Sequence, residues 1–228
     1  MMLGSCVQTA NPNSSVLSEI EDLQLLAEQG DELAQFNLAI MYASIGDGVM
    51  TEYWFTRVAE QGNSIAQLNL GILYFDGLGA FEHLGIPQNF DQALYWFRKA
   101  AEQGEVLAYF YLGVAYHLGQ GVDRNYEYAL YWYEKAAEHD IALAQTNLGM
   151  MYNEGLGVPQ SYEQAVYWFR KAAEQGDSTA QNNLGVSYRD GEGVMQNYGQ
   201  AVYWLNLAID QGNNSARANL DMIPAQYR

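Results

Sequence analysis

Apolar and small residues recur along the chain at the spacing of an α-helix, and the helices that they predict come in pairs. Ala144, Leu148 and Tyr152 lie at positions i, i+4 and i+8, so they share one face of a helix. The stretch 155–159, with two glycines and a proline, ends this pattern, and 162–174 resumes it. The pattern therefore predicts a helical hairpin.

This hairpin is repeated from one end of the chain to the other. Its tryptophan recurs at intervals of 36 residues in Trp96, Trp132, Trp168 and Trp204, and Trp54 lies 42 residues before Trp96. A glycine closes the unit, as expected just past a helix end, and Asp177 or Ser178 can cap the helix that follows. A fixed period of this length is typical of a stacked repeat array, which needs at least about three units to bury a continuous core.

We expect five hairpins between two capping helices, with no linker dividing them. The first cap looks like a second helix without its tryptophan, and the last like a first helix that Pro224 helps to end. The predicted boundaries are a tail at 1–15; a solenoid at 16–222, with a cap at 18–30, repeats at 31–62, 63–104, 105–140, 141–176 and 177–212 and a cap at 213–222; and a tail at 223–228.

The unit AQTNLGMMYNEGLGVPQSYEQAVYWFRKAAEQG closely resembles the Sel-one-like repeat (SLR), a relative of the tetratricopeptide repeat. The resemblance covers roughly residues 20–220, and its small-residue, glycine-loop and KAAEQG positions return in register. It implies an all-α fold, an α/α solenoid with a right-handed superhelix, that binds other proteins and has no chemistry of its own. Such repeats serve as eukaryotic adaptors and as bacterial envelope, secreted or signalling proteins.

Two repeats depart from the regular length. Tyr42 and Trp54 are 12 residues apart, whereas the corresponding pair in repeat four, Tyr152 and Trp168, is 16 apart. Repeat two is longer, and its extra residues lie in the loop 76–90, which carries Phe81, His83, Leu84 and Ile86. Insertions in repeat arrays often belong to the binding face. This loop either folds back on the groove or contacts a partner, or it is a neutral extension.

Three columns of equivalent residues predict packing. The tryptophans are expected in the core, and the tyrosine before each one at its edge, with the hydroxyl in water or on a neighbouring repeat. The third column pairs a basic residue with a glutamate three positions on, which predicts solvated support of a few tenths of a kcal/mol for each pair. The pairs are Arg57 with Glu60, Lys99 with Glu102, Lys135 with Glu138 and Lys171 with Glu174.

A column of asparagines in the first helices requires a specific cause, because asparagine is a mediocre helix-interior residue. Its members are Asn37, Asn69, Asn147, Asn183 and Asn219, with Tyr111 in the remaining position. One interpretation is structural: each amide bonds the backbone of the adjacent repeat. The alternative resembles grooves of the tetratricopeptide and armadillo type, where such a ladder holds an extended peptide, since asparagine both donates and accepts.

The first helices also carry a variable face, which the resemblance places on the concave side of the superhelix. This face is apolar and aromatic in repeats one to three and becomes polar towards the C-terminus, which predicts a binding groove; burial between tightly curved repeats is the other interpretation. The candidate partner-binding residues are Phe36, Asn37, Ile40, Leu68, Asn69, Ile72, Phe75, Phe110, Tyr111, His117, Asn147, Met150 and Asn183.

The charge balance narrows the kind of partner. The chain has 10 basic and 27 acidic residues and a net charge of −17, which argues against nucleic acid and anionic membranes. We expect a protein or peptide partner, of basic character unless the acidity serves only solubility. No apolar run is long enough to span a membrane. The oligomeric state is open, with a monomer as the expectation.

No catalytic residue, metal site or cofactor is predicted. The three histidines lack metal-ligand spacing, and the glycine-rich loops lack the lysine of a phosphate-binding loop. The alternative function, β-lactam binding or hydrolysis, comes only from analogy with cysteine-rich SLR proteins. This chain lacks their cysteines and has no Ser-x-x-Lys motif.

The N-terminus leaves the compartment open. Leu3-Gly4-Ser5-Cys6 resembles the lipobox of a bacterial lipoprotein, but only five residues precede Cys6. If the start is truncated, we expect lipidation of Cys6 and a periplasmic, outer-membrane or secreted protein; otherwise we expect a plain tail and a cytoplasmic protein. As the only cysteine, Cys6 has no internal disulfide partner.

Overall fold

A computed structural model describes the backbone of residues 12–77 and 82–228 and the side chains of residues 19–77 and 83–228. This described part consists of α-helices and two short 3₁₀-helices, without a strand, and it is an α solenoid, as the repeat pattern predicted. First and second helices alternate along the chain. The chain divides into unit 1, up to Gln103, and unit 2, Gly104–Arg228, which are described separately.

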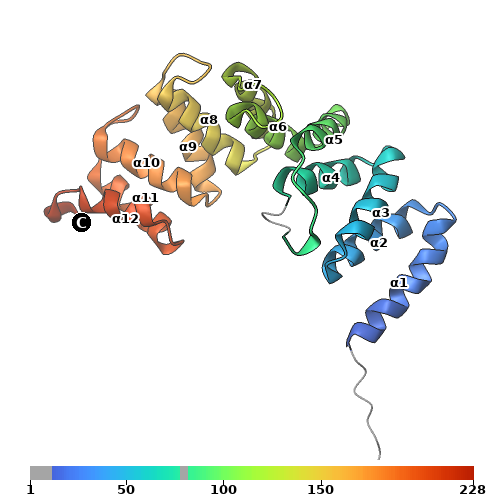
Figure 1. Cartoon of the computed structure of the whole chain (residues 1–228). Helices are drawn as coiled ribbons and strands as arrows, with labels where there is room; N and C mark the ends of the chain where they lie inside the picture. Colours follow the sequence, from blue (N-terminus) through green and yellow to red (C-terminus); the bar gives the residue numbers. More distant parts are fainter. Residues whose placement is uncertain (1–11, 78–81) are drawn as a thin grey trace, which may run out of the picture. The chain divides into compact units, whose positions relative to one another are not determined.

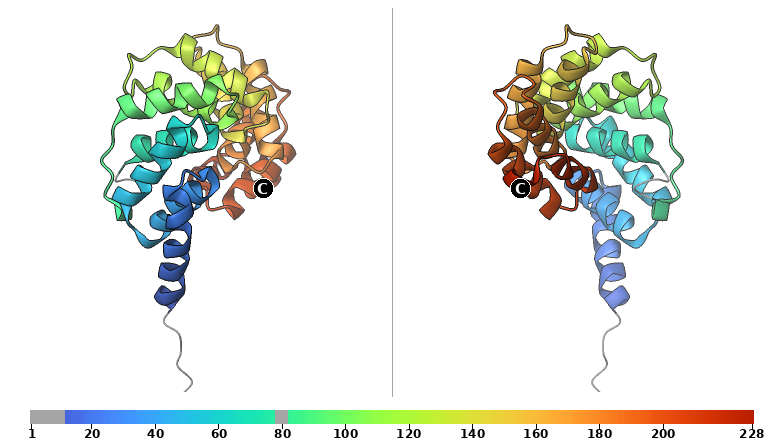
Figure 2. Two further views of the ribbon diagram at one scale, coloured as in Figure 1. Left: turned by 90° about the vertical axis from the view of Figure 1, so that its right-hand side faces the viewer. Right: turned by 90° about the vertical axis from the view of Figure 1, so that its left-hand side faces the viewer.

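Unit 1 holds the first cap and repeats one and two (Figure 1). The lone helix expected at 18–28 begins earlier, at Pro12. Successive helices pack side by side as antiparallel pairs, which the turned views also show (Figure 2). Its elements are α1 (Pro12–Glu28), α2 (Glu32–Ile45), α3 (Gly48–Glu60), α4 (Ser64–Asp76), the 3₁₀-helix η1 (Glu82–Leu84) and α5 (Phe90–Glu102).

Unit 2 holds repeats three to five and the last cap. Its hairpins have uniform helix lengths, and the cap is a single short helix followed by a 3₁₀ turn. Its elements are α6 (Val106–Leu118), α7 (Tyr126–Ala137), α8 (Ala142–Glu154), α9 (Tyr162–Glu174), α10 (Ser178–Asp190), α11 (Tyr198–Asp210), α12 (Asn214–Asp221) and η2 (Ala225–Tyr227).

Local sequence sets where these helices begin and end. The Asp177 carboxylate accepts a hydrogen bond from the Ala180 backbone N–H at 2.7 Å, which confirms it as the predicted N-cap of α10. Asn63 caps α4 in the same way. At the other end, α8 stops at Gly155, whose φ of 72° lies in the left-handed region that favours glycine.

A glycine inside the first helix brings the two helices of a hairpin together. A Cβ atom on Gly149 would overlap the ring of Phe169 on α9. Gly185 faces Leu205 in the same way, and Gly71 and Gly113 hold this position in repeats two and three. Small residues here let a large side chain of the second helix pack against the backbone of the first.

The aromatic columns divide between core and surface. Trp54 and Trp96 are buried, while the tryptophans of unit 2 are half-buried, with Trp168 and Trp204 packed against buried apolar clusters. The preceding tyrosines are 46–54% exposed, and each one meets its tryptophan edge to face with ring centroids 4.8–5.0 Å apart. The tyrosines therefore lie at the edge of the core, as expected.

Buried glutamines tie successive hairpins together, and the sequence analysis missed them. Gln145 is fully buried; its amide donates to the Ala137 carbonyl of the preceding helix at 3.2 Å and accepts from Gln175 at 2.8 Å. The same arrangement recurs with Gln35, Gln67 and Gln181. Repeat three replaces this glutamine by Tyr109, which stacks on Trp132. The visible signal was the recurrence of Ala-Gln in the first helices.

The predicted lysine–glutamate column does not form ion pairs. In the described part of the chain, the ion pairs are Arg189–Asp190 and Arg228–Asp221. The lysines of this column in unit 2 lie over aromatic rings instead: Lys171 is 5.5 Å from the ring centroid of Tyr167, and Lys135 is 5.2 Å from that of Tyr131. An exposed tyrosine one turn earlier gives each lysine a ring face with which its cation can interact.

Candidate functional site

The insertion of repeat two fills space next to the shortened loop of repeat one. Its 3₁₀-helix packs on α3, and Leu84 and Ile86 are only 6% and 3% exposed in the core that contains Trp54. A Cβ atom on Gly48, in the first turn of α3, would overlap the Leu84 carbonyl. The described part of the loop therefore folds back on repeat one; Phe81 lies outside the described residues.

Repeats four and five use the opposite arrangement. There the glycine belongs to the loop: a Cβ atom on Gly157 would overlap the Tyr126 backbone at the start of α7, and one on Gly193 the Tyr162 backbone at the start of α9. In every case the loop crosses the first turn of the preceding second helix. In repeat two the loop supplies the Leu84 backbone carbonyl and α3 supplies the glycine.

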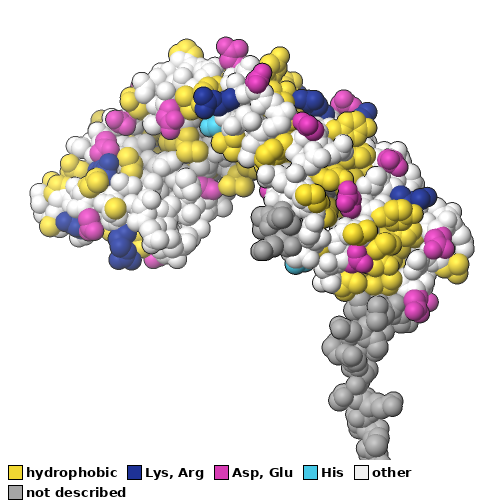
Figure 3. Space-filling view, viewed as in Figure 1, with side chains coloured by type: hydrophobic (Ala, Val, Ile, Leu, Met, Phe, Trp, Pro, Cys, Tyr) yellow, Lys and Arg dark blue, Asp and Glu magenta, His cyan; other side chains and the backbone are white. Residues whose placement is uncertain are grey.

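Beside the contact between η1 and α3, unit 1 has a hollow, which we call the apolar cavity. It has a volume of about 540 Å³ and is lined by Ile40, Ala43, Ser44, Phe55, Asn69, Ile72, Leu73, His83 and Leu84. It brings together three predicted site residues: Ile40, Asn69 and Ile72. Over α2 and α3, the face drawn in Figure 3 carries hydrophobic side chains bordered by acidic ones.

The other predicted residues of unit 1 lie elsewhere. Phe36 meets Phe55 edge to face at 5.6 Å and lines a second hollow, of about 410 Å³, with Leu33 and Ile65. Leu68 and Phe75 are buried. Phe75 packs against Phe90 and Phe97 of α5, with centroids 5.4 and 5.8 Å away. The expectation that Leu68 and Phe75 are exposed in a groove is therefore not met.

The predicted aromatic residues of repeat three are half-buried. Phe110 contacts Tyr111 and Tyr133, with ring centroids 5.5 and 6.1 Å away. The ring of His117 lies edge-on to Tyr126 at 5.5 Å, and its buried Nδ1 has no hydrogen-bond partner among the described residues. Burial lowers the pKa of His117 from its ordinary value of 6.5, with Arg124 adding to this effect and Glu154 opposing it.

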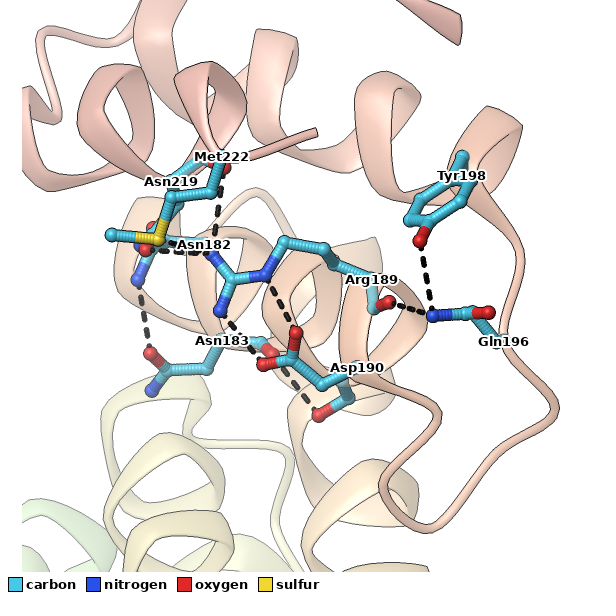
Figure 4. Close-up of polar contacts among 9 residues, drawn as sticks. Asn182, Asn183, Arg189, Asp190, Gln196, Tyr198, Asn219 and Met222 are labelled. Carbon is cyan, nitrogen blue, oxygen red and sulfur yellow. Dashed lines mark hydrogen bonds and ion pairs between the residues drawn. The ribbon is translucent and has the colours of Figure 1, made fainter. Parts of the chain in front are cut away.

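In unit 2, side chains satisfy the asparagine column. Asn147 and the Tyr133 hydroxyl are hydrogen-bonded to each other. Asn182 Nδ2 donates to Asn183 Oδ1 at 3.1 Å, and Asn219 Nδ2 donates to Asn182 Oδ1 at 2.8 Å. Figure 4 shows this chain of amides ending at Arg189, which donates to Asn219 Oδ1 at 3.1 Å. These bonds go to side chains rather than to the backbone of the adjacent repeat.

In unit 1, the asparagine column remains available. Asn37 and Asn69 are partly exposed, and among the residues that the structure describes neither side chain makes a hydrogen bond. Asn69 borders the apolar cavity. The two units therefore differ: the amides of unit 2 bond neighbouring side chains, whereas those of unit 1 have no hydrogen-bond partner among the described residues.

Met150 and Asn183 line a third, smaller hollow in unit 2. Its volume is about 190 Å³, and Glu154 and Glu192 also line it. The first-helix face is thus apolar in repeats one and two and more polar in repeats four and five.

Cys6 lies outside the described residues. Within 12–77 and 82–228, no helix is both long and apolar enough to cross a lipid bilayer. Nor does this part of the chain place three or more His, Cys, Asp or Glu side chains where they could together hold a metal ion.

Tandem helical hairpins joined by glycine-rich loops define a helical-repeat protein. The family model of the Sel1 repeat matches five stretches, at residues 33–63, 64–105, 106–141, 142–177 and 178–213. The chain therefore belongs to the Sel1 repeat family. Sel1 repeat proteins are in general scaffolds for protein interactions and in general non-catalytic.

Solved structures of bacterial proteins share this architecture. The c5321 protective antigen of uropathogenic Escherichia coli, which displays an SLR fold, is 35% identical with a TM-score of 0.80 over 89% of this chain. This chain spans 43% of that antigen's length. A Sel1 repeat protein from Oxalobacter formigenes is 31% identical with a TM-score of 0.75, over 90% of this chain and 86% of its own. The comparison with curated proteins gave no match.

Proposed function

We propose that this protein is a non-catalytic interaction scaffold that binds a polypeptide partner through the first helices of repeats one and two. The observation that carries the proposal is the apolar cavity between α2 and α4, with a free asparagine amide at its border. Ligand sites are typically concave and mostly apolar, with a few polar groups that fix orientation. Sel1 repeat proteins in general have protein partners.

Exposed apolar side chains line both the apolar cavity and the second hollow of unit 1. On the first helices of unit 1, Leu33 is 69% exposed, Ile40 48% and Ile65 51%. Contiguous exposed apolar surface of this kind marks interaction sites in soluble proteins. A bacterial envelope, secretion or signalling context is proposed with this function, as is a partner of basic character, which the net charge of −17 favours.

Affinity capture with matched variants tests the proposal. The double substitution Ile40→Asp/Ile72→Asp places charges in the apolar cavity, and Met150→Asp/Val186→Asp changes the same helix positions in repeats four and five. We expect a polypeptide from the source cells to be captured by the wild type and the second variant and lost from the first. Circular dichroism must show equal helicity. Equal capture by both variants would contradict the proposed site.

A further inference from the structure

The apolar cavity results from the two irregular repeats acting together. Because the loop of repeat one is short, the insertion of repeat two can reach α3, and Leu84 enters the core. Gly48 makes this approach possible, since any side chain there would overlap the Leu84 carbonyl. In repeats four and five, Gly157 and Gly193 bring the loop itself onto the helix. One wall of the cavity therefore depends on three features together: the shortened loop of repeat one, the insertion of repeat two, and Gly48.

The size and lining of the cavity limit what it can hold. About 540 Å³ accommodates a large side chain together with part of the main chain that carries it. Six of the nine lining residues are apolar: Ile40, Ala43, Phe55, Ile72, Leu73 and Leu84. A charged group placed there would lose hydration without gaining a counter-charge from these side chains.

The polar lining residues point to a peptide main chain. The Ser44 hydroxyl already donates to the Met41 carbonyl at 2.7 Å, and His83 is an exposed residue of η1. Asn69 keeps both its donor and its acceptor unused among the described residues, and Asn37 does so at the same position of α2. One amide that both donates and accepts matches the N–H and C=O of a peptide group.

We infer that the apolar cavity is a side-chain pocket for one large aliphatic or aromatic residue of an extended partner segment, whose main chain the Asn69 amide bonds. This inference rests on the proposed function in taking a polypeptide as the partner. Gly48 is a positioning residue, because it acts only by letting η1 lie against α3. The large residue of the partner, which we call the anchor residue, provides the apolar contact, and the hydrogen bonds of Asn69 fix the orientation of the partner's main chain.

The test uses single capped amino acids as probes. N-acetyl-L-leucine N-methylamide carries an anchor side chain and two peptide groups; the lysine and glycine analogues change or remove the side chain. Methyl NMR spectra of the wild type follow Ile40, Ile72 and Leu84 during titration. We expect saturable shifts of these methyls for the leucine derivative, with a dissociation constant on the order of 1 mM, and none for the analogues.

Two variants separate the pocket from its polar contact. Gly48→Ala is expected to abolish the shifts. The control is Gly199→Ala, in the first turn of α11, where an added Cβ atom would meet only the Asn197 side-chain oxygen, at 3.3 Å; this variant should leave the shifts unchanged. Asn69→Leu is expected to weaken the leucine derivative about 2- to 10-fold through the lost hydrogen bonds, without weakening isoamyl alcohol, which has the side chain but no peptide group.

The outcomes distinguish this inference from the proposed function. Absence of shifts at Ile40 and Ile72, or equal shifts with the lysine derivative, would overturn the inference. So would full partner capture by Gly48→Ala when Ile40→Asp/Ile72→Asp loses the partner, because the first-helix face would then bind without the pocket. The proposed function itself would survive that last result.

Discussion

Repeats one and two and repeats four and five are built from the same hairpin, but they use their polar and apolar groups differently. In repeats four and five the loops have the regular length, and Asn147 and Asn183 are bonded to neighbouring side chains. In repeats one and two an insertion replaces a missing loop segment, and within the described part of the chain the corresponding amides of Asn37 and Asn69 have no hydrogen-bond partner. On the proposed function, the regular repeats serve stacking, and the irregular repeats one and two provide the binding surface.

The largest effect is expected where the insertion enters the core. Leu84→Ala removes a buried side chain and should lower the free energy of unfolding by about 2–4 kcal/mol. Urea unfolding measures this change, with Leu118→Ala, at an exposed leucine of unit 2, as the control that should change it by less than about 0.5 kcal/mol. Equal small changes would mean that the insertion is a neutral extension.

The regular repeats should respond next most strongly at the glycine of the first helix. Gly149→Ala forces the new Cβ against the Phe169 ring, and we expect a loss of about 1–3 kcal/mol. Adding Phe169→Leu, which copies the Gly185–Leu205 pair of repeat five, should recover part of this loss. If Gly149→Ala is no more destabilising than Gly199→Ala in urea unfolding, the close approach is unimportant.

A smaller effect is expected from the buried amides between hairpins. Gln145→Leu leaves the Ala137 carbonyl and the Gln175 amide without their partner, at a cost of about 1–2 kcal/mol in thermal or urea unfolding. Gln164→Leu, on the exposed side of α9, is the matched control. Stability equal to the control would show that the buried amide chain contributes nothing.

The smallest effect is a pH dependence in repeat three. Burial lowers the pKa of His117, so the unfolded chain binds the proton more readily than the folded protein. Stability should therefore decrease as the pH falls below 6.5, and His117→Asn should flatten this decrease. Melting temperatures between pH 8 and pH 5 measure it, with His139→Asn, at an exposed position, as the control. An unchanged slope in His117→Asn would assign the acid sensitivity to other groups.

The repeat fold was predictable because its signals are local and recur. The tryptophan period, the glycine-rich loops and caps such as Asp177 each specify part of the hairpin, and five copies reinforce one another. The glutamine chain was missed because an Ala-Gln pair does not reveal its partners: Gln175 lies 30 residues further on, at the end of the second helix, and the Ala137 carbonyl lies on the preceding hairpin. The prediction of lysine–glutamate pairs was wrong because it used sequence spacing alone and did not consider the tyrosine ring over which Lys171 lies.

The candidate site was only partly predictable. Ile40, Asn69 and Ile72 follow from their helix positions, but Leu84 reaches them through a loop whose direction no local pattern specifies. The counterpart that receives the loop is Gly48, in another repeat. Leu68 and Phe75 were predicted to lie in the groove because they share a face of α4 with Ile72. The sequence pattern does not show that neighbouring helices bury part of this face.

Photo-crosslinking at matched positions most directly tests whether the partner binds repeats one and two. A photoreactive amino acid is placed at position 40 in one sample and at position 186 in another, the equivalent site in repeat five. A polypeptide crosslinked in the source cells from position 40 and not from position 186 is the expected result. Equal crosslinking from both positions, or crosslinking from position 186 alone, would contradict the proposed binding region.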